Sequence, residues 1–241
     1  MPSTFNLQPS TFNLQPSTFN LQPLTFNLQP STLNLCSIFE QSSKKSYMEK
    51  IKNIIQSSID VKTQILADSK LLQTVMDCVN VIVNAFEKGN KVLLCGNGGS
   101  ASDAQHLAAE FSGRFYTDRE ALPAEALHCN TSYITAVAND YSYDVIYSRL
   151  IQGIGNRGDI LVGLSTSGNS KNIVNAFEVA KEKDMITIAF TGSGGGKLKK
   201  YADHLINIPS DDTPRIQESH ITLGHIICQL VEEIYFAETN D

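Results

Sequence analysis

The chain has 241 residues, of which 41% are hydrophobic and 18% charged, and its formal net charge is -6. This is the composition of a globular protein with one core, and the acidic balance argues against nucleic acid as a general partner. The sequence contains no run of 18 apolar residues, so we expect neither a membrane span nor a membrane partner.

The cysteines are odd in number, and no two have the CxxC spacing that is typical of zinc or redox motifs. Three of them lie in strongly apolar segments. We therefore expect free thiols, most of them buried, in a protein of the reducing cytoplasm. The cysteines are Cys36, Cys78, Cys95, Cys129 and Cys228.

Residues 2–36 repeat a seven-residue unit, PSTFNLQ, almost without change. A coiled coil has the same period, but a proline in every unit would remove helix hydrogen bonds and clash with the preceding turn. The apolar residues of each unit are too few to form a core. We predict that residues 1–47 form a disordered low-complexity extension, although a repeat array that binds a partner is the alternative. The folded domain is predicted to span 48–241, and Met48 would be a sensible initiator.

From Tyr47 the pattern changes to apolar residues at helical spacing. Residues 50–66 and 70–88 are predicted helices, and the Lys-Gly-Asn sequence at 88–90 ends the second one. An apolar stripe on this second helix predicts its buried face. The stripe consists of Leu71, Val75, Val79, Ile82 and Phe86.

Five short apolar segments follow, and helical patterns separate most of them. Strands that alternate with helices predict a parallel sheet covered by helices on both faces. We expect an α/β fold, a three-layer αβα sandwich with a five-stranded parallel sheet, N-terminal helices and a long C-terminal helix over residues 214–237. The predicted strands are 91–95, 124–129, 159–165, 185–191 and 204–209.

The segment CGNGGS, residues 95–100, follows the first strand and opens a helix. Its glycines allow backbone conformations that other residues resist, and the helix N-terminus offers N–H groups to an anion. The loop lacks the GKS or GKT of a Walker motif, and Ala101 stands where GxGxxG would have its last glycine. A bare glycine turn is the alternative interpretation.

A second loop, STSGNS at residues 165–170, follows another strand, and ligands of such folds bind at the carboxyl ends of strands. Its hydroxyls could cap the next helix, but one cap needs one hydroxyl, and four with a glycine suit the oxygens of a phosphate. Neither loop contains lysine or arginine, which favours a sugar phosphate over a triphosphate. GLSTS nearly matches the GxSxG of serine hydrolases, but Ser167 occupies its last glycine.

The helix after the first loop has His106 and Glu110 one turn apart, on a stripe with Asp103. Leu107 and Phe111 face elsewhere, with the core. The spacing of four residues lets the histidine and the glutamate reach one metal ion or one substrate. A solvated polar face is the alternative.

The last helix has an apolar stripe that includes His220, which we interpret as a hydrogen-bonded core histidine. Gln217 and His225 share a different face, eight residues apart, or about 12 Å along an ideal helix. Both could hold one ion only if the first turn bends at Gln217 or if two copies of the chain contribute. His128 and His204 have no motif around them, and we interpret both as structural or exposed.

Four segments, in order, resemble the phosphoheptose isomerases, a family of SIS (sugar isomerase) domain proteins. They are CGNGGSASDAQHLAAEF, AVANDYSYD, LVGLSTSGNSKNIV and TPRIQESHITLGHI. The resemblance runs from Met48 to Phe236. It implies a flavodoxin-like SIS fold and a cytoplasmic homotetramer with active sites at subunit interfaces. It also implies isomerisation of sedoheptulose 7-phosphate to glycero-manno-heptose 7-phosphate through an enediol, the first step of ADP-heptose synthesis for bacterial lipopolysaccharide.

The resemblance also implies roles for the matching residues. Glu110 and His225 would be the catalytic pair. One Zn²⁺ per subunit would be bound by His106, Glu110, Gln217 and His225. The substrate would contact Asn97, Gly98, Gly99, Ser100, Glu110, Asn139, Asp140, Ser165, Thr166, Ser167, Ser170 and Gln217.

Other SIS proteins share parts of this pattern. A protein that binds the replication initiator DnaA keeps both loops but looks to lack the acid and histidine at the positions of Glu110 and His225. Sugar-phosphate-sensing domains of transcription regulators carry a DNA-binding domain, for which residues 48–90 have no basic balance. An isomerase or etherase of another phosphosugar is a further alternative.

Overall fold

The computed structural model describes the backbone of residues 30–237 and the side chains of residues 44–237. Residues 1–29 of the predicted extension lie outside the described residues. The chain divides into two compact units, Met1–Glu49 and Lys50–Asp241. The start of the folded domain at Met48 stays a prediction.

Helix α1 spans Pro30–Ala67, so residues 30–47 are helical where we expected an extension without regular structure. Pro30 is the last proline of the repeat and the first residue of the helix, where its missing N–H costs nothing and its fixed φ suits the helix. The next proline is Pro123, so nothing of this kind interrupts the helix. The expectation differed because we extended the effect of the repeated prolines beyond the last of them.

Asp68 separates α1 from α2 (Ser69–Glu87). Its side chain accepts hydrogen bonds from the backbone N–H groups of Lys70 and Leu71 and so caps the start of α2. The predicted apolar stripe of α2 is buried along its whole length. This confirms the face that the spacing of apolar residues predicts.

In the rest of the chain one or more helical elements follow each strand, and all five predicted strands are present. They are β1 (Val92–Gly96), α3 (Gly99–Ser112), β2 (Ala124–Ala126), α4 (Thr131–Asp140), the 3-10 helix η1 (Tyr143–Val145), α5 (Ile146–Ile154), β3 (Ile160–Leu164), α6 (Lys171–Glu182), β4 (Ile186–Thr191), the 3-10 helix η2 (Lys197–Lys200), β5 (His204–Asn207) and α7 (Thr213–Tyr235).

Helices α4 and α5 were not predicted. Helix α4 is short and rich in Thr, Tyr, Ile and Val, which are residues that favour strands. Its start is set by Asn130, whose side chain accepts a hydrogen bond from the backbone N–H of Tyr133. A cap and tertiary packing therefore decide a structure that local propensity did not predict.

The five strands form one parallel sheet in the order β2-β1-β3-β4-β5. In its register Val92 of β1 lies opposite Ala124 of β2 and Ile160 of β3. This is the flavodoxin-like order, in which the direction of winding reverses between β1 and β3. The predicted five-stranded parallel sheet is confirmed, and the loops that follow β1 and β3 leave neighbouring strands at the same edge.

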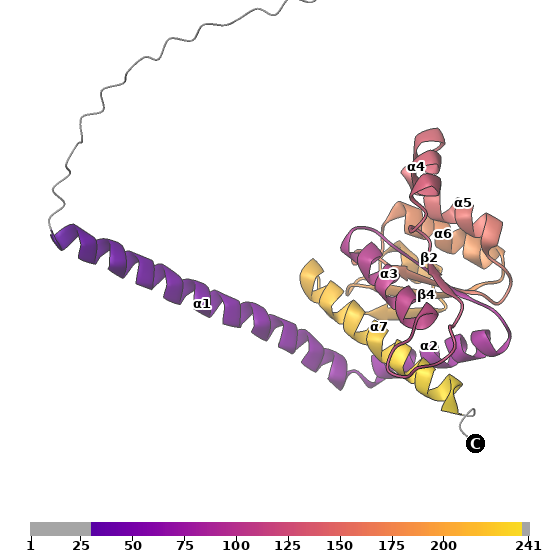
Figure 1. The fold of residues 1–241 in the computed structure, drawn as a ribbon, viewed down its shortest axis with the longest axis horizontal. Helices are drawn as coiled ribbons and strands as arrows, with labels where there is room; N and C mark the ends of the chain where they lie inside the picture. The colour runs from indigo at the N-terminus through magenta and orange to yellow at the C-terminus, as the bar shows by residue number, and fades with distance from the viewer. Residues whose placement is uncertain (1–29, 238–241) are drawn as a thin grey trace, which may run out of the picture. The chain divides into compact units, whose positions relative to one another are not determined.

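Helices cover both faces of this sheet (Figure 1). Buried residues of α2, α3 and α7 form one core with Leu94 and Val162, and those of α4, α5 and α6 form a second core with Leu93 and Leu161. Successive strand residues point to opposite faces, which accounts for the division. The three predicted layers are confirmed. Across the described part of the chain, no helix combines the length and the apolar character needed to cross a membrane.

Candidate active site

The first predicted anion loop connects β1 to α3. Gly98 has a φ of 56° and directly precedes the helix, and no side chain caps this helix end. A Cβ on Gly96 would lie 2.2 Å from the carbonyl oxygen of Ser100, so only glycine fits this turn. The positive end of the α3 dipole thus lies at the carboxyl edge of the sheet, where it favours an anion.

The second loop, residues 165–170, connects β3 to α6. Ser165 is buried, and its hydroxyl lies 3.0 Å from the hydroxyl of Ser170. Ser170 is the N-cap residue of α6, yet its hydroxyl makes no capping hydrogen bond. Helix capping, the simpler explanation of these hydroxyls, therefore does not account for Ser170.

A pair of asparagines joins the two loops. Asn97 of the first loop and Asn172 at the start of α6 each donate to the side-chain oxygen of the other at 2.9 Å. The hydroxyl of Tyr143 donates to the Asn97 oxygen at 3.1 Å, and Asn172 is buried. Tyr143 and Asn172 lie inside the matched motifs, but nothing in their spacing distinguished them from their neighbours. The contact fixes the separation of two loops that are 65 residues or more apart in sequence.

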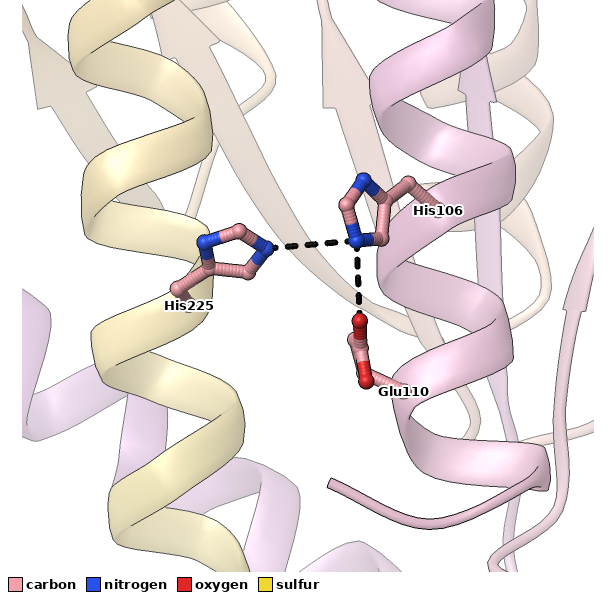
Figure 2. Close-up of side chains that lie close together, drawn as sticks. All are labelled: His106, Glu110 and His225. Carbon is pink, nitrogen blue, oxygen red and sulfur yellow. Dashed lines mark hydrogen bonds and ion pairs between the residues drawn. The ribbon is translucent and has the colours of Figure 1, made fainter. Parts of the chain in front are cut away.

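His106, Glu110 and His225 converge between α3 and α7 (Figure 2). The Nε2 atom of His106 lies 2.8 Å from a carboxylate oxygen of Glu110 and 3.4 Å from the Nε2 atom of His225. One ligand atom from each of the three residues lies within 4.8 Å of the others. We call these three residues the His/Glu cluster. The helical spacing predicted the contact within α3, and only the packing of α7 on α3 adds His225.

The His/Glu cluster fits a divalent metal ion such as zinc. Two imidazoles and a carboxylate form the donor set of catalytic zinc sites that keep a position open for substrate. Two Nε2 atoms that face each other at 3.4 Å need a proton or a shared cation between them, because two lone pairs repel. The side chains of His106 and Glu110 are 50% and 19% exposed, so an ion can reach them from solvent.

Asp103 lies one turn before His106 on α3. One of its carboxylate oxygens is buried and has no hydrogen-bond partner among the described residues. Burial raises the pKa of Asp103, and the nearby His106 and His225 act in the opposite direction. The sequence places Asp103 on the same stripe as His106 and Glu110 without indicating a role. In the structure its carboxylate belongs to the electrostatic surroundings of the His/Glu cluster.

Gln217, the fourth expected ligand, lies nearer to the starts of α3 and α7 than the His/Glu cluster does. Helix α7 is regular from Thr213 onward, so no bent first turn carries Gln217 toward His225. A Cβ on Gly99 would lie 2.7 Å from the Gln217 amide nitrogen, so the amide packs beside the start of α3. Gly99 precedes His106 by seven residues, about 10 Å along the helix. The alternative of a bent first turn is therefore excluded, and within one copy Gln217 does not join the His/Glu cluster.

Asn139 and Asp140 form the last turn of α4. Both are exposed, and the Asn139 amide donates to the Asp140 carboxylate at 2.9 Å. The 3-10 helix η1 follows them and supplies Tyr143, which bonds to Asn97. The pair is thus connected to the first loop through the chain segment that follows it.

His220 is fully buried, and its Nε2 atom lies 3.2 Å from the carbonyl oxygen of Thr191. Its interpretation as a core histidine is confirmed. His128 and His204 are partly buried and lie outside the His/Glu cluster.

Comparison with known proteins identifies the family. The family model described as SIS domain matches residues 46–192. The phosphoheptose isomerase of Aneurinibacillus thermoaerophilus is 53% identical over 77% of this chain and 94% of its own length. The chain belongs to the phosphoheptose isomerase family of SIS-domain proteins. The phosphoheptose isomerase of Clostridium acetobutylicum is 51% identical over 78% of this chain and 95% of its own.

Solved structures of the family have the same fold. The phosphoheptose isomerase of Neisseria gonorrhoeae matches 78% of this chain and 99% of its own with a TM-score of 0.73 at 39% identity. That of Francisella tularensis matches 78% and 98% with a TM-score of 0.74 at 36% identity. These matches confirm the fold class and the family that the four motifs indicated. They favour an enzyme over the DnaA-binding and gene-regulating alternatives.

Proposed function

We propose that this protein isomerises sedoheptulose 7-phosphate to glycero-manno-heptose 7-phosphate, the first step of ADP-heptose and lipopolysaccharide heptose synthesis. The names of its relatives support the reaction. In the structure, the main support is the convergence of His106 and Glu110 of α3 with His225 of α7. The anion loop at the start of α3 adds a site for the phosphate.

The two loops are proposed to hold the phosphate. The start of α3 offers backbone N–H groups, and residues 165–170 offer hydroxyls to its oxygens. The contact between Asn97 and Asn172 would keep the two sets of donors at a constant separation. Phosphate binding far from the reacting carbons would then orient C1 and C2.

Glu110 is the proposed base for the proton that moves between C1 and C2. Its carboxylate would take a proton from C1 of the ketose while the C2 oxygen gains one, which forms the enediol. The enediol would then lose the O1 proton and gain a proton at C2, which forms the aldose. His225 would exchange protons with these oxygens. One Glu110 oxygen contacts His106, which leaves the second for substrate.

We propose that one Zn²⁺ per subunit is bound by His106, Glu110 and His225, with Gln217 as the fourth ligand. The donor atoms of the His/Glu cluster support this assignment. When bound, the ion would supply Lewis-acid polarisation of the substrate oxygens, provided that a coordination position stays open to them.

Each active site is proposed to combine two copies of the chain. Within one copy, Glu110 follows Gly99 by eleven residues, about 16 Å along α3, which is longer than a seven-carbon chain. Gln217 lies at the loop end of this helix, beside Gly99. The loops and Gln217 of one copy would therefore meet the His/Glu cluster of another, as the expected homotetramer requires.

Exposed apolar side chains on α1 support association of copies. Ile51, Ile54, Ile55 and Ile59 lie at helical spacing and are each about half exposed, between 46% and 55%. Such a stripe is typical of a helix that packs against a partner. We also propose a cytoplasmic location, since the buried cysteines of the described chain are free thiols.

The test is turnover of sedoheptulose 7-phosphate by the purified protein. We expect Glu110→Gln and His225→Ala each to lower kcat at least about a hundredfold, the low end for loss of an acid–base group. His220→Asn is the control, because it changes a histidine of the same helix outside the site. Removal of metal with a chelator should abolish turnover, and Zn²⁺ should restore it at about one ion per subunit.

Full activity in both variants would exclude these residue roles. Turnover of another ketose phosphate in place of sedoheptulose 7-phosphate would favour the alternative phosphosugar isomerase. A protein that binds DnaA and turns over none of these substrates would contradict the proposed reaction.

A further inference from the structure

A buried ion pair joins the segment after α3 to the end of α7. The Arg119 Nε atom donates to a carboxylate oxygen of Glu232 at 2.8 Å, and both side chains are 4% exposed. Helices α3 and α7 also carry the His/Glu cluster. The proposed reaction uses neither Arg119 nor Glu232, so their burial needs another explanation.

Arg119 binds the main chain at the end of α3. Its guanidinium donates to the carbonyl oxygens of Glu110 and Phe111 at 2.7 Å each, and to that of Gly113 at 3.1 Å. The last carbonyl groups of a helix have no partner within it, and positive charge is favourable there. Helix α3 has no basic residue in its own last turn. Arg119 therefore holds the backbone that carries the Glu110 side chain.

Glu232 binds the segment that follows. Its two oxygens accept backbone N–H groups of Phe115 at 3.1 Å, Tyr116 at 2.8 Å and Thr117 at 2.9 Å. Burial opposes the charge, but these N–H groups and Arg119 outweigh it and lower the pKa of Glu232 to about 2. The carboxylate is therefore ionised at neutral pH.

The segment held by Glu232 also contacts the second catalytic residue. The Phe115 ring lies 5.7 Å from the His225 ring, measured between centroids, with an angle of 33° between the planes. The Phe115 ring packs in turn against the Tyr116 ring, with 4.6 Å between their centroids. The ion pair thus connects to Glu110 through the main chain and to His225 through one ring.

We propose that Arg119 and Glu232 are positioning residues that keep Glu110 and His225 in reactive geometry. This rests on the proposed function, because it names the support of that same site. A misplacement of about 1 Å can cost a hundredfold in rate, so such support is needed even without contact to substrate.

The test compares Arg119→Lys and Glu232→Gln with the wild-type protein. We expect kcat to fall about ten- to a hundredfold, while KM for sedoheptulose 7-phosphate changes less than about twofold, because the phosphate loops are untouched. Phe115→Leu keeps the ion pair and should lower kcat with little loss of stability. It tests the link to His225 should either pair variant fail to fold.

Asp159→Asn is a control of matched chemistry. Asp159 is also buried, pairs with Lys91 at 2.6 Å and accepts the backbone N–H of Asn156 at 2.8 Å. It directly precedes β3, however, at the sheet edge opposite the loops. We expect a comparable loss of Tm with kcat within about twofold of wild type.

Amide hydrogen exchange gives a readout that does not depend on turnover. Exchange over residues 113–117 should be faster in Glu232→Gln and unchanged in Asp159→Asn. An unchanged kcat in Glu232→Gln, or a fall no larger than that of Asp159→Asn, would overturn the positioning role while leaving the proposed function intact. A wild-type protein without turnover would instead reject the proposed function, and this role with it.

Discussion

At the scale of single residues, His220 makes the free energy of unfolding depend on pH. The ring is fully buried, and its Nδ1 atom has no partner among the described residues. Burial lowers the pKa of His220 to about 4, although the hydrogen bond to the Thr191 carbonyl acts in the opposite direction. The folded protein therefore keeps this ring neutral at pH values where an exposed histidine is charged.

The lowered pKa of His220 makes the folded protein less stable as the pH falls. As the pH falls from about 6.5 toward 4, the unfolded chain binds a proton at His220 that the folded chain does not, so stability decreases by up to about 3 kcal/mol. Urea unfolding at pH 7, 5.5 and 4.5 would measure this slope. His220→Asn should be less stable at pH 7 and should have a flatter slope. An equal slope in both proteins would show that other groups cause the pH dependence.

At the scale of elements, the close approach of α3 and α7 brings the cluster together. Gly224 precedes His225 on α7, and Leu107 follows His106 on α3. A Cβ on Gly224 would lie 2.6 Å from a methyl group of Leu107, which is itself buried. A glycine next to His225 therefore allows the two helices to approach more closely than a larger residue would permit.

Gly224→Ala should push α3 and α7 apart and lower kcat about tenfold or more. It should also cost about 1–3 kcal/mol of stability through overpacking, although alanine is the better helix former. Gly153→Ala is the control, because that glycine lies in α5 with open space around it. This variant protein should be slightly more stable than wild type. Thermal unfolding and steady-state kinetics measure both effects. Wild-type kinetics in Gly224→Ala would exclude a tight helix contact as the reason for this glycine.

Elements could be predicted where their signal is local. The strands and α2 follow from runs and stripes of apolar residues, and the structure confirms them. Helix α4 has residues that favour strands, and its Asn130 cap carried too weak a signal by itself. The stretch 30–47 of α1 differed from expectation because Pro30 can begin a helix as well as interrupt one.

At the scale of the whole molecule, the proposal that each site combines two copies predicts complementation. Gln217→Ala keeps the His/Glu cluster, and His106→Ala keeps the loops and Gln217. Each variant alone should have little activity. Subunits mixed, unfolded and refolded together should regain a substantial part of wild-type kcat, because intact halves meet across the new interfaces.

The control for complementation mixes His106→Ala with His225→Ala, which damage the same half and should regain nothing. Light scattering would give the mass of the assembly, for which we expect four chains. Restored activity in the control mixture, or none in the first mixture, would be incompatible with loops and cluster on different copies.

The sequence by itself determined the sheet, the order of its strands along the chain, both loops and the pairing of His106 with Glu110. These follow from patterns within a few neighbouring residues, such as apolar runs, helical spacing and turn glycines. Such patterns can be read in each segment without knowledge of the rest of the fold. The family resemblance names His225 and Gln217 as site residues but says nothing of their distances. Tertiary structure alone decided that His225 contacts His106, that Asn172 joins the loops, that Gln217 lies beside Gly99, and that Arg119 meets Glu232. Those contacts join residues more than 70 positions apart, and they arise only when helices pack on one another and on a common sheet.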